Sequence, residues 1–519
     1  MALGVGALAI TVVVLGRVFG TNAAGGADSS GYLSQADLWA QGRLEQPLPA
    51  ASHLAWWPGG YRAFAPLGWS ATSPEVMVPT YPPGLPLVMA AAMKATGRRS
   101  SALWVVPVFG GAVIWLTFLI GWCVDGPATG LAAACLLASS PIFLLQLMAP
   151  MSDVPVTAWW LLALHLSTKR SNTALLLAGA AASAAVLTRP NLLPLALIPV
   201  IAASATREGG WRTGLRGAAL VGGLVVPGGL LLAWLNRRLR GSPTAFGYGS
   251  LDALYSWGAL WPNLSQYVRW LVQEHSPILL IGLLAPVLLH ERWRAGGRDR
   301  RSWIALSSWT VFVVAVLLCY VPYLEFGAHE WTYLRFLLPG LAALTVLCLA
   351  AVFRCSQGLA PRWRAFTRVC IILCLALWSL NRTMSHRVFD VARAERRYPA
   401  VGQFASGALP ANAVFVALQQ TGSLNYYSGR PVLRWPRIPR DGFSRVLLRL
   451  EHHGYAPYIV LEEWEEPLFT KQFARHGGPG RLDWPPTAEY QGPMVVRIYS
   501  PADRPRFAAG IPIRTVNIR

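Results

Sequence analysis

Residues 148–164 read MAPMSDVPVTAWWLLAL, and this stretch indicates what kind of protein the chain is. An acidic residue, Asp153, comes directly before an apolar run, with Pro155 in what would be the first turn of a helix. Such a run is typical of a helix that enters a lipid bilayer, which about 20 apolar residues span. Asp153 then lies where the helix meets the membrane surface, either as an N-cap or as a functional group.

The rest of the chain has the same apolar character. Hydrophobic residues make up 54% of the 519 residues and charged residues 13%, and the mean hydropathy is +0.40. This composition excludes an ordinary soluble enzyme and predicts an α-helical polytopic membrane protein. We expect about eleven spans, at 2–19, 101–123, 128–147, 154–168, 173–188, 190–205, 215–235, 275–290, 303–323, 334–353 and 367–382.

Basic residues in alternate connections predict the orientation of these spans. By the positive-inside rule the connections that carry them are cytoplasmic. Residues 20–100, 236–274 and 384–519 then face outward, together with Asp28 and Asp153. The basic residues are Lys169, Arg170, Arg207, Arg212, Arg216, Arg292, Arg294, Arg298, Arg300, Arg301, Arg354, Arg362, Arg364 and Arg368.

The first apolar segment, 2–19, predicts a retained helix. A cleaved signal peptide ending near Ala23-Ala24-Gly25 is the alternative, but no basic stretch precedes the apolar residues. The net charge of +21 does not indicate a nucleic-acid partner, because the chain has no zinc-finger spacing and no P-loop. Topology accounts for much of the charge, and the rest suits anionic lipid headgroups or a phosphate-bearing substrate.

The last part of the chain, 384–519, has shorter apolar runs and more charge. The runs at 414–418, 458–461 and 494–498 have the length of strands, and 441–453 places four apolar residues on one helix face: Phe443, Val446, Leu447 and Leu450. We therefore predict a membrane domain over 1–383, with a long first outer loop over about 20–100, and a small soluble α/β domain over 384–519.

Two segments of the first outer loop carry candidate site residues. Residues 27–42, ADSSGYLSQADLWAQG, predict a short helix that can lie along the membrane surface, with Asp28 as its N-cap or as a functional carboxylate. Residues 78–91, VPTYPPGLPLVMAA, place Tyr81 before paired prolines that begin an apolar helix.

The order of these motifs resembles a known group of enzymes. The outer Asp28 helix is followed by TYPPGLPLV (80–88), MSDVPVTAWWLLALHL (151–166), LTRPNLLPLA (187–196) and YLRFLLPGLAAL (333–344). This series resembles bacterial relatives of the protein O-mannosyltransferases and the lipid A aminoarabinose transferases, multispanning glycosyltransferases of the GT-C superfamily. The distal QTGSLNYYSGRPVLRW (420–435) is similar to the soluble tail of many members.

The resemblance implies an enzyme of the bacterial inner membrane that acts at the outer face. It would move a sugar, with inversion, from a polyprenyl-phosphate carrier to a hydroxyl-bearing protein, lipid or glycan acceptor. Asp28 matches the family's catalytic Asp and would be a general base. One carboxylate is enough, because a phosphate leaves without the protonation that glycosidase leaving groups need. The partners are membrane lipid and the lipid-linked donor, with no tightly bound cofactor.

Four more residues are candidates for substrate binding. Asp153 matches the family's second outer acid and would position the acceptor, or hold a divalent cation together with Asp28. Arg189 and Arg335, at outer ends of apolar spans, would bind the departing phosphate or else extend to lipid headgroups. Tyr81 replaces a lysine of the aminoarabinose transferases; it would hydrogen-bond sugar or phosphate, or act as an interfacial aromatic residue.

Other candidates and other classes of function remain at this point. Arg237, Arg238 and Arg240 lie in another outer loop, and Tyr426, Tyr427 and Arg430 either touch the acceptor sugar or belong to a strand and turn of the tail. A lipid-linked sugar flippase or permease, or a non-catalytic membrane subunit, is the alternative to an enzyme. Acidic residues that cluster at one face, without a visible repeat, favour the enzyme.

Overall fold

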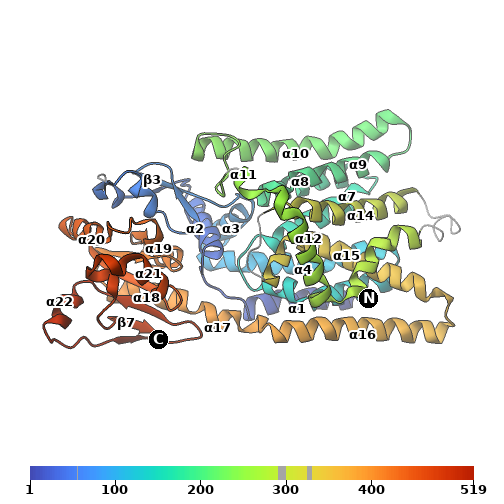
Figure 1. Cartoon of the computed structure of the whole chain (residues 1–519). Coiled ribbons are helices and arrows are strands. Elements are labelled where there is room, and N and C mark those ends of the chain that lie inside the picture. The colour runs from blue at the N-terminus through green and yellow to red at the C-terminus, as the bar shows by residue number, and fades with distance from the viewer. Residues whose placement is uncertain (55–56, 250, 290–299, 324–329) are drawn as a thin grey trace.

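The structure, a computed structural model, describes residues 1–54, 57–249, 251–289, 300–323 and 330–519. A bundle of long helices is followed by a C-terminal domain that lies at one end of the bundle (Figure 1). Arg292, Arg294 and Arg298 of the predicted cytoplasmic cluster lie outside the described residues.

Most helices of the bundle coincide with the predicted apolar segments, but α12 (Leu260–His275) falls in the predicted outer connection 236–274. The bundle helices are α1 (Ala2–Val18), α4 (Ala102–Val124), α5 (Pro127–Ala138), α6 (Pro141–Leu147), α7 (Asp153–Ser167), α8 (Asn172–Thr188), η4 (Pro190–Ala196), α9 (Leu197–Ala205), α10 (Trp211–Arg240), α12, η6 (Pro277–Leu284), α14 (Arg300–Tyr320), η7 (Trp331–Leu337), α15 (Leu338–Cys355) and α16 (Pro361–Ser385). α1 packs on α4, and a Cβ on Gly111 would lie 2.8 Å from Val13 Cγ2.

Judged by the length and composition of its described helices, the chain has fewer membrane spans than the eleven predicted. In the described ranges, five helices are long and apolar enough to cross a membrane, or up to seven if each bent pair forms one span. The predicted span 128–147 is bent by 65° between α5 and α6, where Pro141 begins a new helix. Ser276, with φ of +75°, separates α12 from η6, and these two are bent by 113°. The expectation of about eleven spans is therefore not confirmed.

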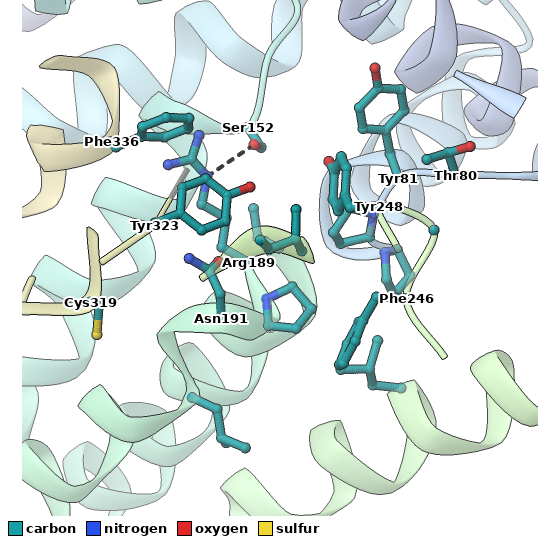
Figure 2. A pocket seen from close by; sticks show the side chains of 18 of the residues that line it. Thr80, Tyr81, Ser152, Arg189, Asn191, Phe246, Tyr248, Cys319, Tyr323 and Phe336 are labelled. Atoms are coloured by element: carbon teal, nitrogen blue, oxygen red, sulfur yellow. Dashed lines mark hydrogen bonds between the residues drawn. The ribbon is translucent and has the colours of Figure 1, made fainter. Parts of the chain in front are cut away.

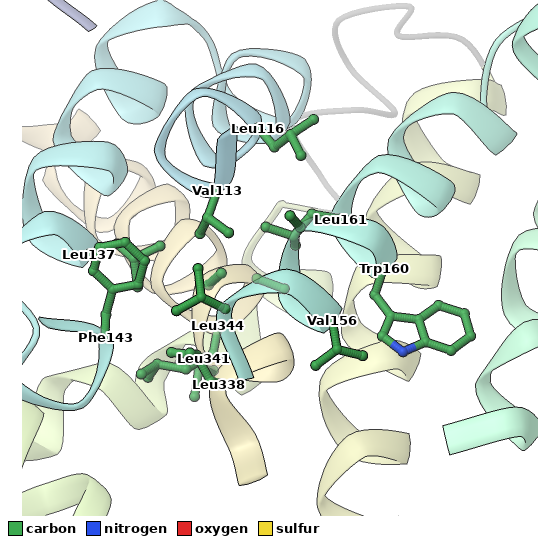
Figure 3. Packing of buried hydrophobic residues seen from close by; sticks show 14 of the residues in the cluster. Val113, Leu116, Leu137, Phe143, Val156, Trp160, Leu161, Leu338, Leu341 and Leu344 are labelled. Atoms are coloured by element: carbon green, nitrogen blue, oxygen red, sulfur yellow. The ribbon is translucent and has the colours of Figure 1, made fainter. Parts of the chain in front are cut away.

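α15 forms the centre of the bundle. All of its residues from Leu338 to Phe353 are buried, and Figure 3 shows Leu338, Leu341 and Leu344 packed among side chains of α4, α5, α6 and α7. Glycines allow the helices to approach closely; a Cβ on Gly121 of α4 would lie 2.6 Å from the Cα of Gly130 in α5. Close packing of this kind fixes the helices that carry the site.

The two ends of the bundle differ in charge. Arg170 pairs with Glu208, and Arg207 donates to Asn172 at 2.6 Å, so the α7–α8 and α9–α10 turns lie together. The α9–α10 and α15–α16 connections lie at the end of the bundle remote from the C-terminal domain (Figure 1). These basic turns thus lie away from that domain.

The first outer loop folds into a compact unit. It contains α2 (Asp28–Ala40), α3 (Gly84–Thr96) and a three-stranded antiparallel sheet in the order β1-β3-β2, formed by β1 (Gln46–Pro47), β2 (Trp69–Ala71) and β3 (Val76–Pro79). The helix predicted after Asp28 is confirmed as α2. Nine of the 13 residues of α2 are buried, because α2 packs between α3 and the C-terminal domain.

The C-terminal domain is the predicted α/β unit. Its six-stranded sheet has the order β5-β4-β6-β8-β7-β9, with β4 parallel to β5 and β6. The predicted helix is α20 (Phe443–His452), and it buries Phe443, Val446, Leu447 and Leu450 as expected. The elements are α17 (Val391–Glu395), α18 (Arg397–Ala408), β4 (Ala413–Ala417), α19 (Thr421–Ser428), β5 (Val432–Arg434), β6 (Ala456–Glu462), α21 (Glu466–Phe473), β7 (Ala488–Tyr490), β8 (Val496–Tyr499), α22 (Asp503–Ala508) and β9 (Val516–Ile518).

Candidate active site

A cavity of about 980 Å³ lies between the first outer loop and the bundle. Asp28, Tyr81, Asp153, Arg189 and Arg335 all line it, although they come from five separate parts of the sequence. Figure 2 shows Arg189, Tyr323 and Phe336 on one side of the cavity and Tyr81, Tyr248 and Phe246 on the other. The fold thus gathers all five candidate site residues in one place.

Asp28 is the first residue of α2, and its carboxylate faces two donors. Tyr81 Oη donates to Oδ1 at 2.6 Å, and Arg335 Nη1 donates to Oδ2 at 3.1 Å. The N-cap position belongs to Ala27, and no side chain caps the helix. The alternative role of Asp28 as an N-cap is therefore wrong. Its side chain is one-third exposed, so it remains reachable from the cavity.

Asp153 is fully buried and pairs with Arg189. Arg189 Nη2 lies 2.5 Å from Asp153 Oδ1, and Arg189 Nε donates to Ser152 Oγ at 3.4 Å. Ser152 occupies the N-cap of α7 without a capping bond, so the N-cap role predicted as the alternative for Asp153 is also wrong. The buried Arg189 does not extend to lipid headgroups. A buried ion pair of this geometry fixes the guanidinium, since breaking it is costly.

The two arginines contact the same aromatic residue. The guanidinium carbons of Arg189 and Arg335 lie 5.4 Å and 5.1 Å from the ring centre of Phe336, within the range of cation–π contacts. Tyr320 stacks on the same ring at 5.0 Å and accepts a hydrogen bond from Arg189 Nη1 at 3.2 Å. Two cations are thus held near the same point of the cavity, as binding of a phosphate requires.

Two tyrosines complete the surroundings of Asp28. Tyr32 Oη donates to Ser152 Oγ at 3.0 Å, and its ring packs on Tyr81 at 4.6 Å. Burial, and then the charge of Asp28, raise the pKa of both phenols. Both therefore stay protonated near neutral pH and act as hydrogen-bond donors, so Tyr81 donates to the carboxylate and does not compete with it as a base.

The expected divalent cation finds no suitable ligand set. Asp28 and Asp153 each face a guanidinium, and among the residues that the structure describes, no three His, Cys, Asp or Glu side chains come together as a metal site. A divalent cation prefers several unpaired oxygen ligands. We derive no step through a metal.

Arg240, at the end of α10, contributes more than the sequence indicates. Its Nη2 donates to the carbonyls of Pro79 and Thr80, the second at 3.3 Å, and its Nη1 donates to Asn236 Oδ1 at 3.1 Å. Arg240 therefore ties α10 to the segment that carries Tyr81. The neighbouring Arg238 lies 3.8 Å from Glu45, with more than half of its side chain exposed. Tyr320 and Tyr248 were not predicted, because tyrosine at a membrane surface carries no distinctive sequence signal.

The tail residues considered for acceptor binding make internal contacts instead. Tyr427 Oη accepts a hydrogen bond from Ala24 N at 2.9 Å, and Arg99 lies over the ring of Tyr426 at 5.0 Å. Arg430 donates to the carbonyls of Ala405 and Ser406. Tyr426 and Tyr427 thus hold the C-terminal domain against the first outer loop, and Arg430 holds the domain itself together.

We call the contact between the C-terminal domain and the first outer loop the docking surface. It extends to the first turn of α2. Thr421 Oγ1 accepts from Leu67 N at 3.1 Å, and a Cβ on Gly422 would lie 2.1 Å from Ser30 Oγ. Ser30 is buried and donates in turn to the carbonyl of Gly26. α19 of the C-terminal domain therefore packs directly on the first turn of α2.

Comparison with known proteins identifies the fold. No family model matches the sequence, and no curated protein matches it. Similar solved structures include ArnT from Cupriavidus metallidurans bound to undecaprenyl phosphate (14% identity, TM-score 0.53), with 95% of this chain and 97% of that chain covered. The oligosaccharyltransferase of Archaeoglobus fulgidus has 12% identity and a TM-score of 0.57, with 91% of this chain and 71% of that chain covered.

A third similar structure is the arabinofuranosyltransferase AftD from mycobacteria, with 14% identity and a TM-score of 0.52. The match covers 89% of this chain and 35% of AftD. All three are GT-C glycosyltransferases, so the predicted resemblance is confirmed at the level of the fold. At these identities the comparison establishes architecture, and the site must supply the argument for function.

Proposed function

We propose that this protein is an inverting glycosyltransferase of the bacterial inner membrane. It would transfer a sugar from a polyprenyl-phosphate carrier to a hydroxyl-bearing acceptor at the outer face. One observation carries the proposal: the Asp28 carboxylate and the guanidinium groups of Arg189 and Arg335 line one cavity whose other walls are largely aromatic and apolar. The ArnT structure, which contains undecaprenyl phosphate, supports this choice of carrier.

In the proposed reaction, Asp28 acts on the acceptor, and Arg335 and Arg189 act on the leaving phosphate. The acceptor oxygen attacks the anomeric carbon from the face opposite the phosphate, and the bond between that carbon and the phosphate oxygen breaks. The acceptor proton passes to Asp28, the general base. The phosphate keeps the electron pair of the broken bond, and Arg335 and Arg189 stabilise the added negative charge. No group needs to protonate the leaving phosphate.

Asp153 is a positioning residue in this scheme. Its carboxylate, fully buried, holds Arg189 at 2.5 Å. Asp153 is too enclosed to bind an acceptor directly. We therefore propose that it positions Arg189 and does not contact the acceptor. Tyr81 holds Asp28 from the other side.

Two measurements on the purified full-length protein in lipid nanodiscs test the proposal. Binding of undecaprenyl phosphate by native mass spectrometry should weaken about tenfold or more in Arg335→Gln. Release of undecaprenyl phosphate from a panel of synthetic undecaprenyl-phosphate monosaccharides, in the presence of membrane extract as acceptor source, should be lost in Asp28→Asn while binding is retained. Unchanged release in Asp28→Asn would remove the proposed base.

The transporter alternative predicts a different result. A flippase would move the lipid-linked sugar across the bilayer of a proteoliposome without releasing undecaprenyl phosphate. Translocation that persists in Asp28→Asn, with no carrier released by the wild-type protein, would favour the flippase.

The orientation is testable with cysteines. In a cysteine-free background, a membrane-impermeant maleimide added to intact spheroplasts should label Ser52→Cys, an exposed position of the first outer loop. It should not label restored Cys355, an exposed residue at the basic end of α15. The opposite pattern would place the site in the cytoplasm and contradict the proposal.

A further inference from the structure

Helix α2 presents a row of four side chains to the cavity. Asp28, Tyr32, Gln35 and Trp39 follow one another at intervals of four, three and four residues, and all four line the cavity. This spacing places them on one face of the helix. The row begins at the proposed base, and its far half has no part in the reaction described above.

Two polar atoms of this far half have no partner among the described residues. They are Gln35 Oε1 and Trp39 Nε1, on side chains that are 2% and 9% exposed. Gln35 Nε2 donates to the carbonyl of Tyr81 at 3.3 Å, which fixes the amide orientation, since the reverse would set two oxygens together. A buried polar atom without a partner costs about 1–3 kcal/mol, so such atoms in a cavity wall point to a ligand.

The wall beside them offers a third polar atom without a partner among the described residues, and this one is a donor. Arg240 donates to the carbonyls of Pro79 and Thr80, and Gln35 donates to the next carbonyl, that of Tyr81. Gln35 and Arg240 thus bind the same short segment. Arg240 Nε is buried without a partner among the described residues. Tyr248 packs edge-on to the Tyr81 ring at 5.7 Å. We call Gln35, Trp39, Arg240 and Tyr248 the distal subsite.

We propose that the distal subsite binds carbohydrate of the acceptor. Each sugar hydroxyl both donates and accepts, so neighbouring hydroxyls can pair with the Gln35 oxygen and with the N–H groups of Trp39 and Arg240. The aromatic faces of Trp39 and Tyr248 suit the apolar face of a sugar ring. The combination of one acceptor, two donors and two aromatic faces suits a polyhydroxylated ring, so the acceptor in this proposal is a glycan or glycolipid.

The position of the subsite separates acceptor from donor. At about 1.5 Å per residue, Gln35 and Trp39 lie roughly 10 Å and 16 Å along the helix from Asp28. The transferred sugar must lie between Asp28 and the phosphate held by Arg335, so a different part of a substrate occupies the distal subsite. This step rests on the proposed function.

Photo-crosslinking tests the subsite without knowledge of the natural acceptor. The probes are a synthetic neutral trisaccharide glycoside and a serine-containing peptide, each carrying the same diazirine group, added to the full chain in nanodiscs. In wild-type protein the glycoside should label peptides from α2 and the end of α10 with saturation. In Gln35→Met and Trp39→Phe the concentration for half-saturation should rise about tenfold, and the serine peptide should label neither segment.

The chain supplies matched controls for both variants. Gln146 and Trp484 are also buried with Oε1 and Nε1 unpaired among the described residues, but they lie outside the cavity. Gln146→Met and Trp484→Phe should leave labelling unchanged. If Gln35→Met does not fold, the milder Trp39→Phe decides.

The proposal would be overturned if the concentration for half-saturation were unchanged in folded Gln35→Met and Trp39→Phe. Saturable labelling by the serine peptide in place of the glycoside would also overturn it. Carrier release by Asp28→Asn distinguishes this failure from failure of the proposed reaction. Loss of glycoside labelling in the distal variants, with release unaffected in Asp28→Asn, keeps the subsite and rejects the base. The reverse pattern rejects only the subsite.

Discussion

Replacing Asp153 by asparagine should destabilise the protein strongly, because Arg189 would keep its charge in a buried position without a counter-ion. Asp153 is fully buried, and the side chain of Arg189 is only 10% exposed. Removing one partner of such a pair costs about 3–5 kcal/mol. Ser152 and Tyr320 also hydrogen-bond Arg189, but neither carries charge to neutralise it.

The double variant Asp153→Asn with Arg189→Gln separates stability from function. It removes both charges, so its unfolding free energy should recover most of the loss seen in each single variant. Binding of undecaprenyl phosphate should not recover, because the cation is gone. Equilibrium unfolding in mixed micelles measures the first quantity, and native mass spectrometry the second.

An ion pair at the protein surface provides the control for this comparison of single and double variants. Asp483 and Arg504 lie 2.7 Å apart with 42% and 34% of their side chains exposed. Asp483→Asn should cost no more than about 1 kcal/mol. If Asp153→Asn were equally mild, or if the double variant were no more stable than both singles, the buried pair would not be coupled and our assignment of Asp153 would be wrong.

Three other predictions concern the base, the docking surface and the pH. Tyr81→Phe removes a hydrogen bond to the Asp28 carboxylate, worth about 1.5 kcal/mol for a charged acceptor, so kcat for carrier release should fall roughly tenfold; an unchanged kcat would show that Tyr81 does not hold the base. Gly422→Ala places a Cβ 2.1 Å from Ser30 Oγ and should lower carrier release severalfold, whereas Gly407→Ala, which meets nothing within 4 Å, should not; equal rates would separate the tail from catalysis. Burial raises the pKa of Glu465 to about 7, so the folded domain binds a proton that the unfolded chain releases near pH 4.5, and stability should fall as pH rises from about 5 to 7; thermal unfolding of Glu465→Gln should show a smaller fall, and an equal one would reject the assignment.

The sequence predicts much of the secondary structure and of the site. Each predicted apolar segment contains helix, and the helix face of Phe443, Val446, Leu447 and Leu450 is correct because burial follows the helical period. The pairing of Asp153 with Arg189 was within reach as well. α7 and α8 are apolar helices of similar length joined by a short turn, so the start of one must lie beside the end of the other.

Other features depend on contacts between distant segments. The burial of α2 follows from packing against α19, nearly 400 residues later, and no local pattern indicates it. Apolar residues on α2 are equally consistent with a membrane surface and with a protein surface. The carboxylates of Asp28 and Asp153 likewise stand at the starts of helices, where capping is the local expectation. Instead, Ala27 and Ser152 occupy the N-cap positions, and Asp28 meets Arg335, 307 residues away in sequence.

The charges around the cavity suggest how donor binding activates the base. Arg335 pairs with Asp28 and Arg189 with Asp153, so each of these two cations is balanced by one carboxylate. The two pairs differ in burial: Asp153 is enclosed, whereas Asp28 is one-third exposed and Arg335 one-quarter. An incoming phosphate therefore competes for Arg335 more easily than for Arg189. In the proposed reaction, Arg335 would turn to the phosphate and Asp28 Oδ2 would lose its donor, while Tyr81 would still hold Oδ1. Donor binding would thus free Asp28 to accept the acceptor proton.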